Sequence, residues 1–519
     1  MSCRRGPAEL SLAGEWQFAL DPEDIGVKQE WQNKELGETL RLPGSLQEQG
    51  KGEDVSLDTK WTGQIVDSSW YKAPEYAKYR QAGNIKVPFW LNPDKHYVGV
   101  AWYRKKVNVP SGWENRPVIL DLERTHWETT LFLDGQKVGS QNSLQTPHRY
   151  LLDGLKAGEH TFTLRVDNRL YVDVGMNAHS VSDHTQSNWN GIIGEMKLSA
   201  KPSLYIESVQ IFPDIKKRQA QVKIQLKGSA EAGAPTVSLQ AVTFDGKPVG
   251  SPVQSAVEPG KETEPVEMVV DMGEEAGLWS EHTPNAYKMN VSVQSSGGTD
   301  EACYDFGLRE FKANGTRFEV NGQPVFLRGT LECCIFPLTG YPAMQPDYWA
   351  KIYRTCKEYG LNHVRFHSWC PPEAAFHVAD SMGIYLQVEC GAWAEVGSGK
   401  PQDQWLKEES DRILKAYGNH PSFCMMVYGN EPAGADQVAY LSGLVDYWKS
   451  KDSRHVYSSA AGWPYVGNAD YWNAPNPRIQ AWGAGLRSII NREAPRTDYD
   501  FAGIIRQDMP TVSHEIGQW

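Results

Sequence analysis

The sequence predicts a multidomain protein in which two β-sandwiches precede an α/β barrel. Three observations support this fold class. The 519 residues exceed what a single hydrophobic core normally holds. Short runs of alternating apolar residues fill the first part of the chain up to about residue 312. Beyond that point, continuous apolar strands alternate with amphipathic helices, which is typical of a parallel sheet covered on both faces.

Residues 1–200 are predicted to form a jelly-roll-like sandwich of antiparallel strands. Its clearest hairpin is HWETTLFLDGQKVGS, with a turn at Asp134 and Gly135. An irregular insertion at residues 45–97 is rich in Trp, Tyr, Gly and Pro, and a second irregular segment, VGMNAHSVSDHTQSNWNG, covers residues 174–191. Both segments could reach the mouth of the barrel, although surface loops without function explain their irregularity as well.

Residues 201–312 are predicted to form a second all-β unit of immunoglobulin-like size. The strands AQVKIQLKG, TVSLQAVTF and YKMNVSVQSS carry the alternating pattern of apolar and polar residues most clearly.

Residues 313–519 are predicted to form a (β/α)₈ barrel, entered through the hairpin RFEVNGQPVF with a turn at Asn321 and Gly322. The expected strands are VFLRGTLE, LNHVRFHS, GIYLQVEC, SFCMMVYGNE, HVYSSAAG, RIQAWG and TVSHE. Between the first five strands lie the helices PDYWAKIYRTCKEYG, PEAAFHVADSMG, QDQWLKEESDRILKAYG and ADQVAYLSGLVDYWKSK. Only seven strands are found before the chain stops on Trp519, so we expect a truncated barrel without its last strand and helix.

Composition excludes some classes of function. The net charge of −12 comes without a basic run, which argues against a nucleic-acid partner. No apolar run is long enough to cross a bilayer, and the start MSCRRGPAEL does not resemble a signal peptide. Six of the eight Cys lie on apolar segments without metal-type spacing and are predicted to be buried thiols. The 19 Trp either fill cores or stack on sugar rings.

Polar and aromatic side chains gather at the carboxyl ends of the predicted barrel strands, where the active sites of barrel enzymes lie. These positions are Arg328, Glu332, Arg365, His367, Glu389, Asn430, Glu431, Trp463, Trp482, His514 and Glu515. Hydrolysis of a glycosidic bond needs one carboxylic acid and one carboxylate on opposite sides of the sugar. Glu431 and Glu515 end two different strands at one mouth and are the candidate pair.

Several of these residues also have an ordinary structural interpretation. Glu431 could cap the helix that follows it. Glu389 and Glu332 could be buried ion-pair partners of Arg328 or Arg365. The side chains of Trp463, Trp482 and Trp393 could close the top of the barrel core instead of forming a sugar platform, and His514 could be a packing histidine that points away from the mouth.

Four motifs are the most specific features of the chain: NGQPVFLRG, YGLNHVRFHS, YGNHPSFCMMVYGNEP and PTVSHEIG. Together with the opening LSLAGEWQF and the order of the domains, they resemble glycoside hydrolase family 2, the family of bacterial β-galactosidases, β-glucuronidases and β-mannosidases. The resemblance covers essentially the whole chain.

The resemblance implies that Glu431 is the general acid/base and Glu515 the nucleophile of a retaining mechanism. It also implies that Asn430 binds the 2-hydroxyl of the sugar and that Arg365 is the arginine of the motif on the second strand. His367 departs from the family pattern, because it lies one place earlier than the family's histidine. His367, Glu389, Trp463, Trp482 and His514 complete the expected substrate-binding set.

No metal or cofactor is expected. The segment QVECGAWAEVG does not reproduce the motif on which the metal site of some β-galactosidases depends, and no Gly-rich phosphate loop follows a strand. A metal hydrolase would need His and Asp clusters that the sequence lacks. Family members that work in the periplasm or outside the cell suggest such a location, while oligomeric state is not readable.

The sequence therefore predicts an exo-acting retaining β-glycosidase whose partner is a carbohydrate. A β-galactoside is the first expected substrate and a β-glucuronide the second. The alternative is a noncatalytic glycan-binding protein, a β-sandwich lectin with a vestigial or truncated barrel.

Overall fold

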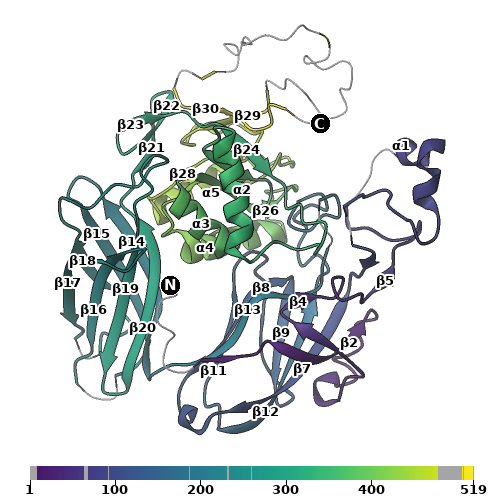
Figure 1. Cartoon of the computed structure of the whole chain (residues 1–519), viewed down its shortest axis with the longest axis horizontal. Helices are drawn as coiled ribbons and strands as arrows, with labels where there is room; N and C mark the ends of the chain where they lie inside the picture. Colours follow the sequence, from purple (N-terminus) through teal and green to yellow (C-terminus); the bar gives the residue numbers. More distant parts are fainter. Residues whose placement is uncertain are drawn as a thin grey trace.

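A computed structural model describes residues 9–63, 68–91, 93–185, 188–230, 233–258, 260–476, 492, 505–506 and 508–517. Within these residues the protein is mostly β and is built from two sandwiches and an α/β unit (Figure 1). The predicted mostly-β multidomain architecture is therefore confirmed.

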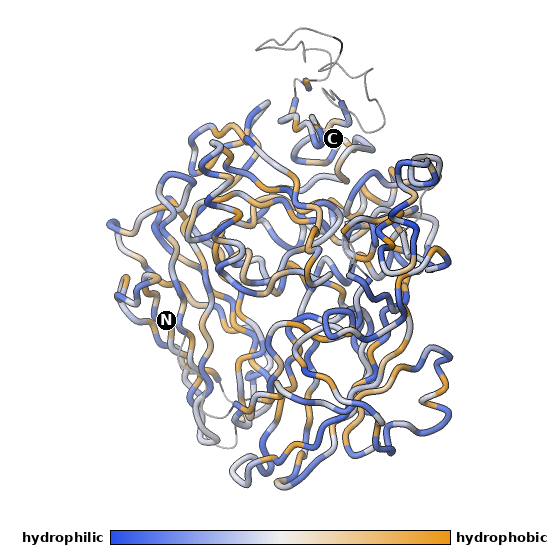
Figure 2. Tube along the Cα trace, turned by 45° about the vertical axis from the view of Figure 1, so that its right-hand side comes forward, coloured by the Kyte–Doolittle hydropathy of each residue, from blue (hydrophilic) through white to orange (hydrophobic). Residues whose placement is uncertain are grey.

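The first sandwich consists of two antiparallel sheets that bury an apolar core between them. Apolar and polar residues alternate along its strands, as the orange and blue segments of Figure 2 show, because successive side chains point to opposite faces. One sheet has the order β10-β9-β12-β7-β2-β3, with bounds Gln136–Gln141, Glu128–Leu133, Gly158–Asp167, Val100–Val109, Gly14–Asp21 and Glu38–Leu42. The other has the order β1-β13-β8-β11, with β4 also paired to β13, and bounds Glu9–Ser11, Gly191–Ala200, Val118–His126, His148–Leu152 and Gly44–Ser45.

The irregular insertion contains little regular structure. Its elements are the pair β5 and β6 (Glu53–Asp54 and Lys95–His96), helix α1 (Ser69–Lys72) and a 3-10 turn at Pro74–Arg80. Two further 3-10 turns of the sandwich lie at Trp31–Asn33 and Ser111–Trp113.

The second sandwich has a three-stranded and a four-stranded antiparallel sheet around its own apolar core. The first sheet has the order β14-β15-β18, with bounds Leu204–Asp214, Gln219–Gly228 and Val266–Asp271. The second has the order β17-β16-β19-β20, with bounds Pro248–Ala256, Thr236–Thr243, Ala286–Ser295 and Gly298–Gly307. A small sheet of β21, β22 and β23 follows, with bounds Phe311–Asn314, Arg317–Val320 and Gln323–Val325.

Both predicted hairpin turns are confirmed. Asp134 and Gly135 join β9 to β10 with φ angles of 49° and 79°. Asn321 and Gly322 join β22 to β23 with φ angles of 54° and 77°. Two consecutive positive φ angles are typical of the tight turn that matches the twist of antiparallel strands, and Asp-Gly and Asn-Gly adopt them most readily.

The α/β unit contains one parallel sheet with the order β24-β25-β26-β27-β28. Its strands have the bounds Gly329–Glu332, His363–Phe366, Tyr385–Ala392, Phe423–Gly429 and Val456–Tyr457. The intervening helices α2, α3, α4 and α5 have the bounds Pro346–Glu358, Glu373–Met382, Pro401–Tyr417 and Gln437–Lys451. None of the helices in the described ranges is both long and apolar enough to cross a membrane.

The pairing of the described strands does not close a barrel, and the predicted succession of strands needs correction. The fifth predicted strand contributes only Val456 and Tyr457, while β29 (Trp472–Ala474) was not predicted and pairs in parallel with β30 (Thr511–Ser513) as a separate two-stranded sheet. The sixth predicted strand, RIQAWG, lies outside the described residues. The (β/α)₈ barrel accordingly stays a prediction.

The first sandwich and the α/β unit share one hydrophobic cluster. The rings of Trp127, after β8, and Trp405, on α4, meet edge to face with centroids 5.2 Å apart. Both indole N–H groups donate to the carbonyl of Asn142, at 2.9 Å and 3.1 Å. The six predicted thiols are free, and all but the half-buried Cys333 are buried.

Candidate active site

The structure gathers most of the predicted site residues at the carboxyl ends of the parallel strands. Arg365 lies on β25 and Glu389 on β26, Asn430 and Glu431 directly follow β27, and the pair His514 and Glu515 follows β30. Asn430 and Glu431 follow the end of a buried strand, whereas Arg365 and Glu389 are charges buried within strands, where each needs a partner.

Arg365 connects four chain segments at this edge. Its Nε donates to Glu389 Oε1 at 2.6 Å and its Nη2 to Asn430 Oδ1 at 2.7 Å. Its Nη1 donates to the carbonyl of His514 at 3.3 Å and lies 3.7 Å from Glu515 Oε1. The other oxygen of Glu389 accepts the backbone N–H of Ser368 at 2.6 Å. The geometry thus supports the ion-pair interpretation of Glu389.

Glu431 and Glu515 face each other across the edge. One carboxylate oxygen of each, together with a ring nitrogen of His514, lies within 4.8 Å of the others. His514 Nε2 is 3.4 Å from Glu431 Oε1 and 3.7 Å from Glu515 Oε1. His514 thus does not point away from the mouth, which corrects the expected orientation, although its buried ring also meets the carbonyl of Ala474 through Nδ1 at 3.0 Å. Strand β30 ends at Ser513, so strand alternation no longer separates the side chains of His514 and Glu515.

Glu431 is held in an uncommon backbone conformation. Its φ is 32°, a value that few residues other than glycine adopt. Its N–H donates to Ala461 and that of Asn430 to Ala392, both at 2.9 Å. Helix α5 begins after Asp436, so the interpretation of Glu431 as a helix cap is wrong. Gly462 leaves room for the carboxylate, because a Cβ there would lie 2.9 Å from Glu431 Cγ.

His367 contacts Glu515, and a residue of the first sandwich supports it. Nε2 of His367 is 3.2 Å from Glu515 Oε1. The ring of His179 stacks on His367 with centroids 4.1 Å apart. Burial lowers the pKa of both imidazoles well below the usual range, and for His367 the charge of Arg365 adds to this effect. A neutral His367 that meets a carboxylate through Nε2 carries its proton on that atom.

The segment of residues 174–191 reaches the mouth, which is one of the two alternatives left open by the sequence. The backbone N–H of His179 donates to Ser368 Oγ at 2.8 Å, and Ser180 Oγ donates to the carbonyl of Gly391 at 2.9 Å. The backbone N–H of Trp393 donates to the carbonyl of Val174 at 2.8 Å. His179 was not singled out in the sequence, and the only signal for it was its place in this irregular segment.

The Trp-rich insertion packs on the same segment. Asp183 accepts the backbone N–H groups of Thr62 and Gly63 at 2.5 Å and 3.1 Å, and the ring of Phe89 lies 4.9 Å from that of His184. Burial raises the pKa of the Asp183 carboxyl to about 6. A direct contribution of the insertion to the mouth stays a prediction.

The other predicted residues take different positions. Trp463 is 37% exposed and donates its indole N–H to the carbonyl of Pro432 at 2.8 Å, so it lies at the rim beside Glu431. Trp482 lies outside the described residues. Arg328 pairs with Glu281 at 3.2 Å. Burial raises the pKa of Glu332 to about 7, and its carboxylate accepts the N–H of Cys334 at 3.0 Å.

Replacing Gly175 by alanine should separate the first sandwich from the mouth. Gly175 has a φ of 88°, and a Cβ there would lie 1.8 Å from the carbonyl oxygen of Trp393. We expect Gly175→Ala to destabilise the protein by about 2 kcal/mol or more, measured by denaturant unfolding. The matched control is Gly154→Ala, which also has a positive φ, 69°, but nothing within 4 Å. Equal losses in the two variants would contradict the steric explanation.

Comparison with known proteins identifies the family of the chain. Residues 10–202 match the model "Glycosyl hydrolases family 2, sugar binding domain", and residues 204–309 match the model "Glycosyl hydrolases family 2". These ranges cover more than half of the chain and correspond to the two sandwiches.

Sequence relatives carry the name β-galactosidase. A β-galactosidase of Aeromonas hydrophila is 23% identical over 453 residues, which are 82% of this chain and 41% of that protein. A β-galactosidase large subunit of Latilactobacillus sakei is 22% identical over 482 residues, which are 87% of this chain and 72% of that protein. The chain thus spans about two fifths of the length of the Aeromonas relative.

Solved structures share the fold. A β-glycosidase from Bacteroides vulgatus matches with a TM-score of 0.67 at 17% identity. The matched part is 89% of this chain and 55% of that protein's chain. The β-glucuronidase of Ruminococcus gnavus matches with a TM-score of 0.66 at 16% identity. The matched part is 91% of this chain and 76% of that protein's chain. With two family models matching successive parts of the chain and this shared fold, the protein belongs to glycosyl hydrolases family 2.

Proposed function

We propose that the protein is an exo-acting retaining β-glycosidase that uses Glu515 as nucleophile and Glu431 as general acid/base. The observation that carries the proposal is the approach of the two carboxylates within 4.8 Å. Retaining enzymes hold their two carboxyl groups about 5–5.5 Å apart, whereas inverting enzymes leave room for a water molecule between them.

The reaction would have two steps. In the first, a Glu515 oxygen attacks the anomeric carbon while the protonated Glu431 gives its proton to the departing glycosidic oxygen. In the second, Glu431 takes a proton from water, and the oxygen of that water displaces Glu515 from the anomeric carbon. Both carboxyl groups then return to their starting protonation states, and the sugar keeps its configuration.

The surroundings of the two residues support these roles. The Arg365 guanidinium and the Nε2–H group of His367 face Glu515. Both groups stabilise a carboxylate, which suits a nucleophile. Glu431 is the more exposed of the two, with 14% of its side chain accessible against 5% for Glu515. That position suits a residue that exchanges protons with a leaving group and with water.

Asn430 is suited to bind the 2-hydroxyl. Because its Oδ1 accepts from Arg365, the amide orientation is fixed and Nδ2 points elsewhere. This buried Nδ2 has no hydrogen-bond partner among the described residues, which leaves it able to donate to a sugar hydroxyl. His367, His514, Trp463 and Trp482 are proposed as further substrate-binding residues; Glu389 would act through Arg365.

A panel of aryl β-glycosides incubated with the full chain tests the activity. We expect release from a β-galactoside or, as the second choice, a β-glucuronide, in keeping with the names of the relatives and structural neighbours. Proton NMR of the first-formed sugar should show the β anomer. A chelator should leave the rate unchanged, since the proposal uses no metal. The α anomer as first product, or loss of activity on chelation, would contradict the mechanism.

The same proposal places the catalytic site in a (β/α)₈ barrel over residues 313–519, with the sandwiches at residues 1–200 and 201–312 as separate domains.

The rival candidate is a noncatalytic glycan-binding protein. Sugar binding by calorimetry without turnover of any aryl glycoside by the full chain would favour that rival.

A further inference from the structure

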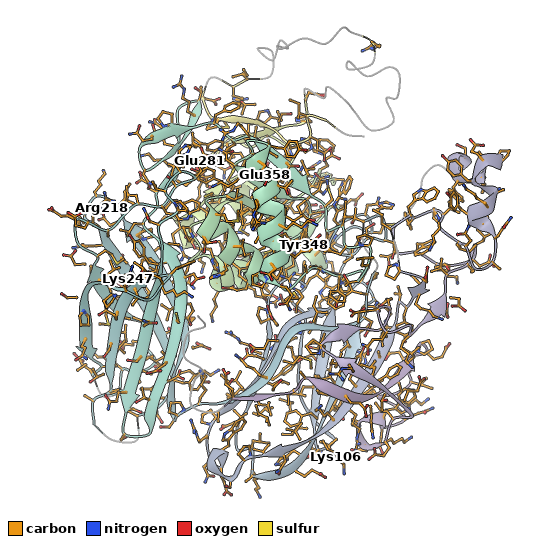
Figure 3. All side chains as sticks on the ribbon, viewed as in Figure 1. Lys106, Arg218, Lys247, Glu281, Tyr348 and Glu358 are labelled. Carbon is orange, nitrogen blue, oxygen red and sulfur yellow. The ribbon has the colours of Figure 1, made fainter. Side chains whose placement is uncertain are left out.

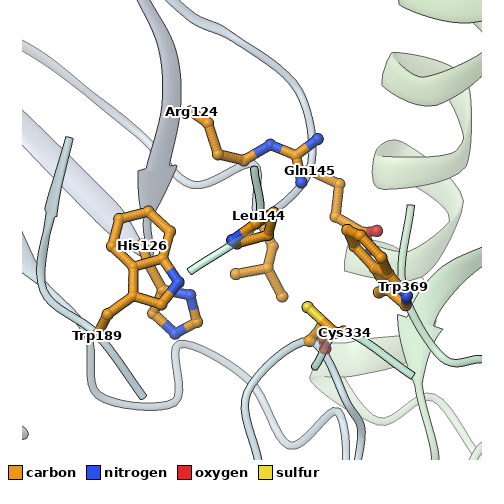
Figure 4. Close-up of a pocket in the computed structure, with 9 residues that line it drawn as sticks. Arg124, His126, Leu144, Gln145, Trp189, Cys334 and Trp369 are labelled. Carbon is orange, nitrogen blue, oxygen red and sulfur yellow. The ribbon is translucent and has the colours of Figure 1, made fainter. Parts of the chain in front are cut away.

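A buried pocket lies between the first sandwich and the α/β unit, apart from the carboxylate pair. Figure 4 shows Arg124 and His126 of β8 on one side of it, and Cys334 and Trp369 of the α/β unit on the other. Leu144, Gln145, Ser180, Trp189 and Pro342 complete its lining. All nine lining residues are buried, so the pocket does not admit a sugar.

Arg124 is the charged group of this pocket. It is 4% exposed, and its Nη1 donates to the carbonyl of Cys370 at 3.0 Å. Its Nε and Nη2 are buried and have no hydrogen-bond partner among the described residues. The amide of Gln145, which is 1% exposed, likewise has no partner for its nitrogen or its oxygen within the described ranges.

No carboxylate among the described residues forms a hydrogen bond with Nε or Nη2 of this guanidinium. The sequence neighbour Glu123 accepts the N–H of Glu195 at 2.6 Å; burial raises its pKa, and the charge of Arg124 partly opposes that rise without a direct ion pair. Burial lowers the pKa of His126 to about 3, so this imidazole is neutral and adds no charge. A buried guanidinium with unsatisfied N–H donors is costly, since burial removes its hydration.

Arg309 shows how the protein satisfies a buried guanidinium without a carboxylate. This side chain is 5% exposed, and its Nε, Nη1 and Nη2 donate to the carbonyls of Pro421, Arg454 and Phe423 at 3.0 Å, 2.5 Å and 2.7 Å. At Arg124, by contrast, the carbonyl of Cys370 is the one acceptor that the described residues supply. The remaining donors face a pocket that Gln145 also lines, and this side chain can turn its NH₂ group toward the same space.

We infer that this pocket binds a small monovalent anion of the size of chloride, held by Nε and Nη2 of Arg124 and by the amide of Gln145. Such an ion would accept several N–H groups at once and would pair directly with the guanidinium. Because both the sandwich and the α/β unit line the pocket, a bound anion would fasten the two together. The inference does not depend on the proposed glycosidase activity.

Thermal unfolding of the full chain tests the site at constant ionic strength. Chloride or bromide should raise the midpoint by about 2–3 °C over gluconate, which is too large to enter. The rise should be absent in Arg124→Met and kept in Arg116→Met. Arg116 loses the same charge from the same sandwich, but its guanidinium already donates to the carbonyls of Ala200 and Lys201.

A bromide soak of wild-type crystals gives a second readout that needs no variant. An anomalous peak within hydrogen-bond distance of Arg124 Nε and Nη2 supports the site. Water alone at that position, or the same halide response in Arg124→Met as in the wild type, would overturn the inference. If Arg124→Met does not fold, the presence or absence of the bromide peak in the wild type decides whether the pocket binds an anion.

Discussion

Glu515→Gln is expected to lower kcat/KM for the best aryl β-glycoside by at least about 10⁴-fold, since the first bond to the sugar can no longer form. The substitution keeps the size of the side chain and the possibility of contact with His367, which lies 3.2 Å away, so the fold should persist. Steady-state rates and a thermal unfolding curve of the same preparation check both parts of the expectation.

Glu431→Gln distinguishes the two roles. Its rate should fall by about 10²–10⁴-fold for substrates with poor leaving groups and much less for those with good ones, because only the former need the proton. The control is Glu358→Gln at the exposed end of α2, which Figure 3 labels; it should match the wild type. For the first variant, near-normal turnover of the Glu515→Gln enzyme would show that Glu515 is not the nucleophile.

Arg365→Met is expected to destabilise the protein by about 3–5 kcal/mol, because it leaves the fully buried Glu389 without its ion-pair partner. Asn430 would lose the donor that fixes its amide, so activity should fall as well. Denaturant unfolding of the full chain measures the change in the free energy of unfolding.

The double variant Arg365→Met with Glu389→Gln separates this explanation from simple loss of packing. Since no buried charge is left alone, the double variant should be less destabilised than the sum of the two single variants. Additive losses would show that the two side chains stabilise the fold independently of their ion pair.

The local features of the fold could be predicted from the sequence because their determinants are local. Asp134-Gly135 and Asn321-Gly322 specify their turns through backbone preferences of two adjacent residues. The strand-end rule likewise found Arg365, Asn430 and Glu431, because an apolar run that stops at a polar residue marks the edge of a buried sheet.

Other features depend on contacts that a pattern cannot show. Strand β28 has only two residues, and β29 has three, too few for a clear alternation. His179 donates through its backbone to Ser368, 189 residues along the chain, and nothing in the local sequence around either residue indicates the other. The orientation of His514 was mispredicted because the strand ends one residue before it.

The shared carbonyl of Asn142 has a consequence for the order of synthesis. Trp405 follows Asn142 by 263 residues, so a ribosome adding about 5–20 residues per second needs roughly 15–50 s to supply the second indole. During that interval the face of the first sandwich around Trp127 is uncovered, because its partner surface has not been made. Nascent chains are therefore most exposed to chaperones and proteases before α4 emerges from the ribosome.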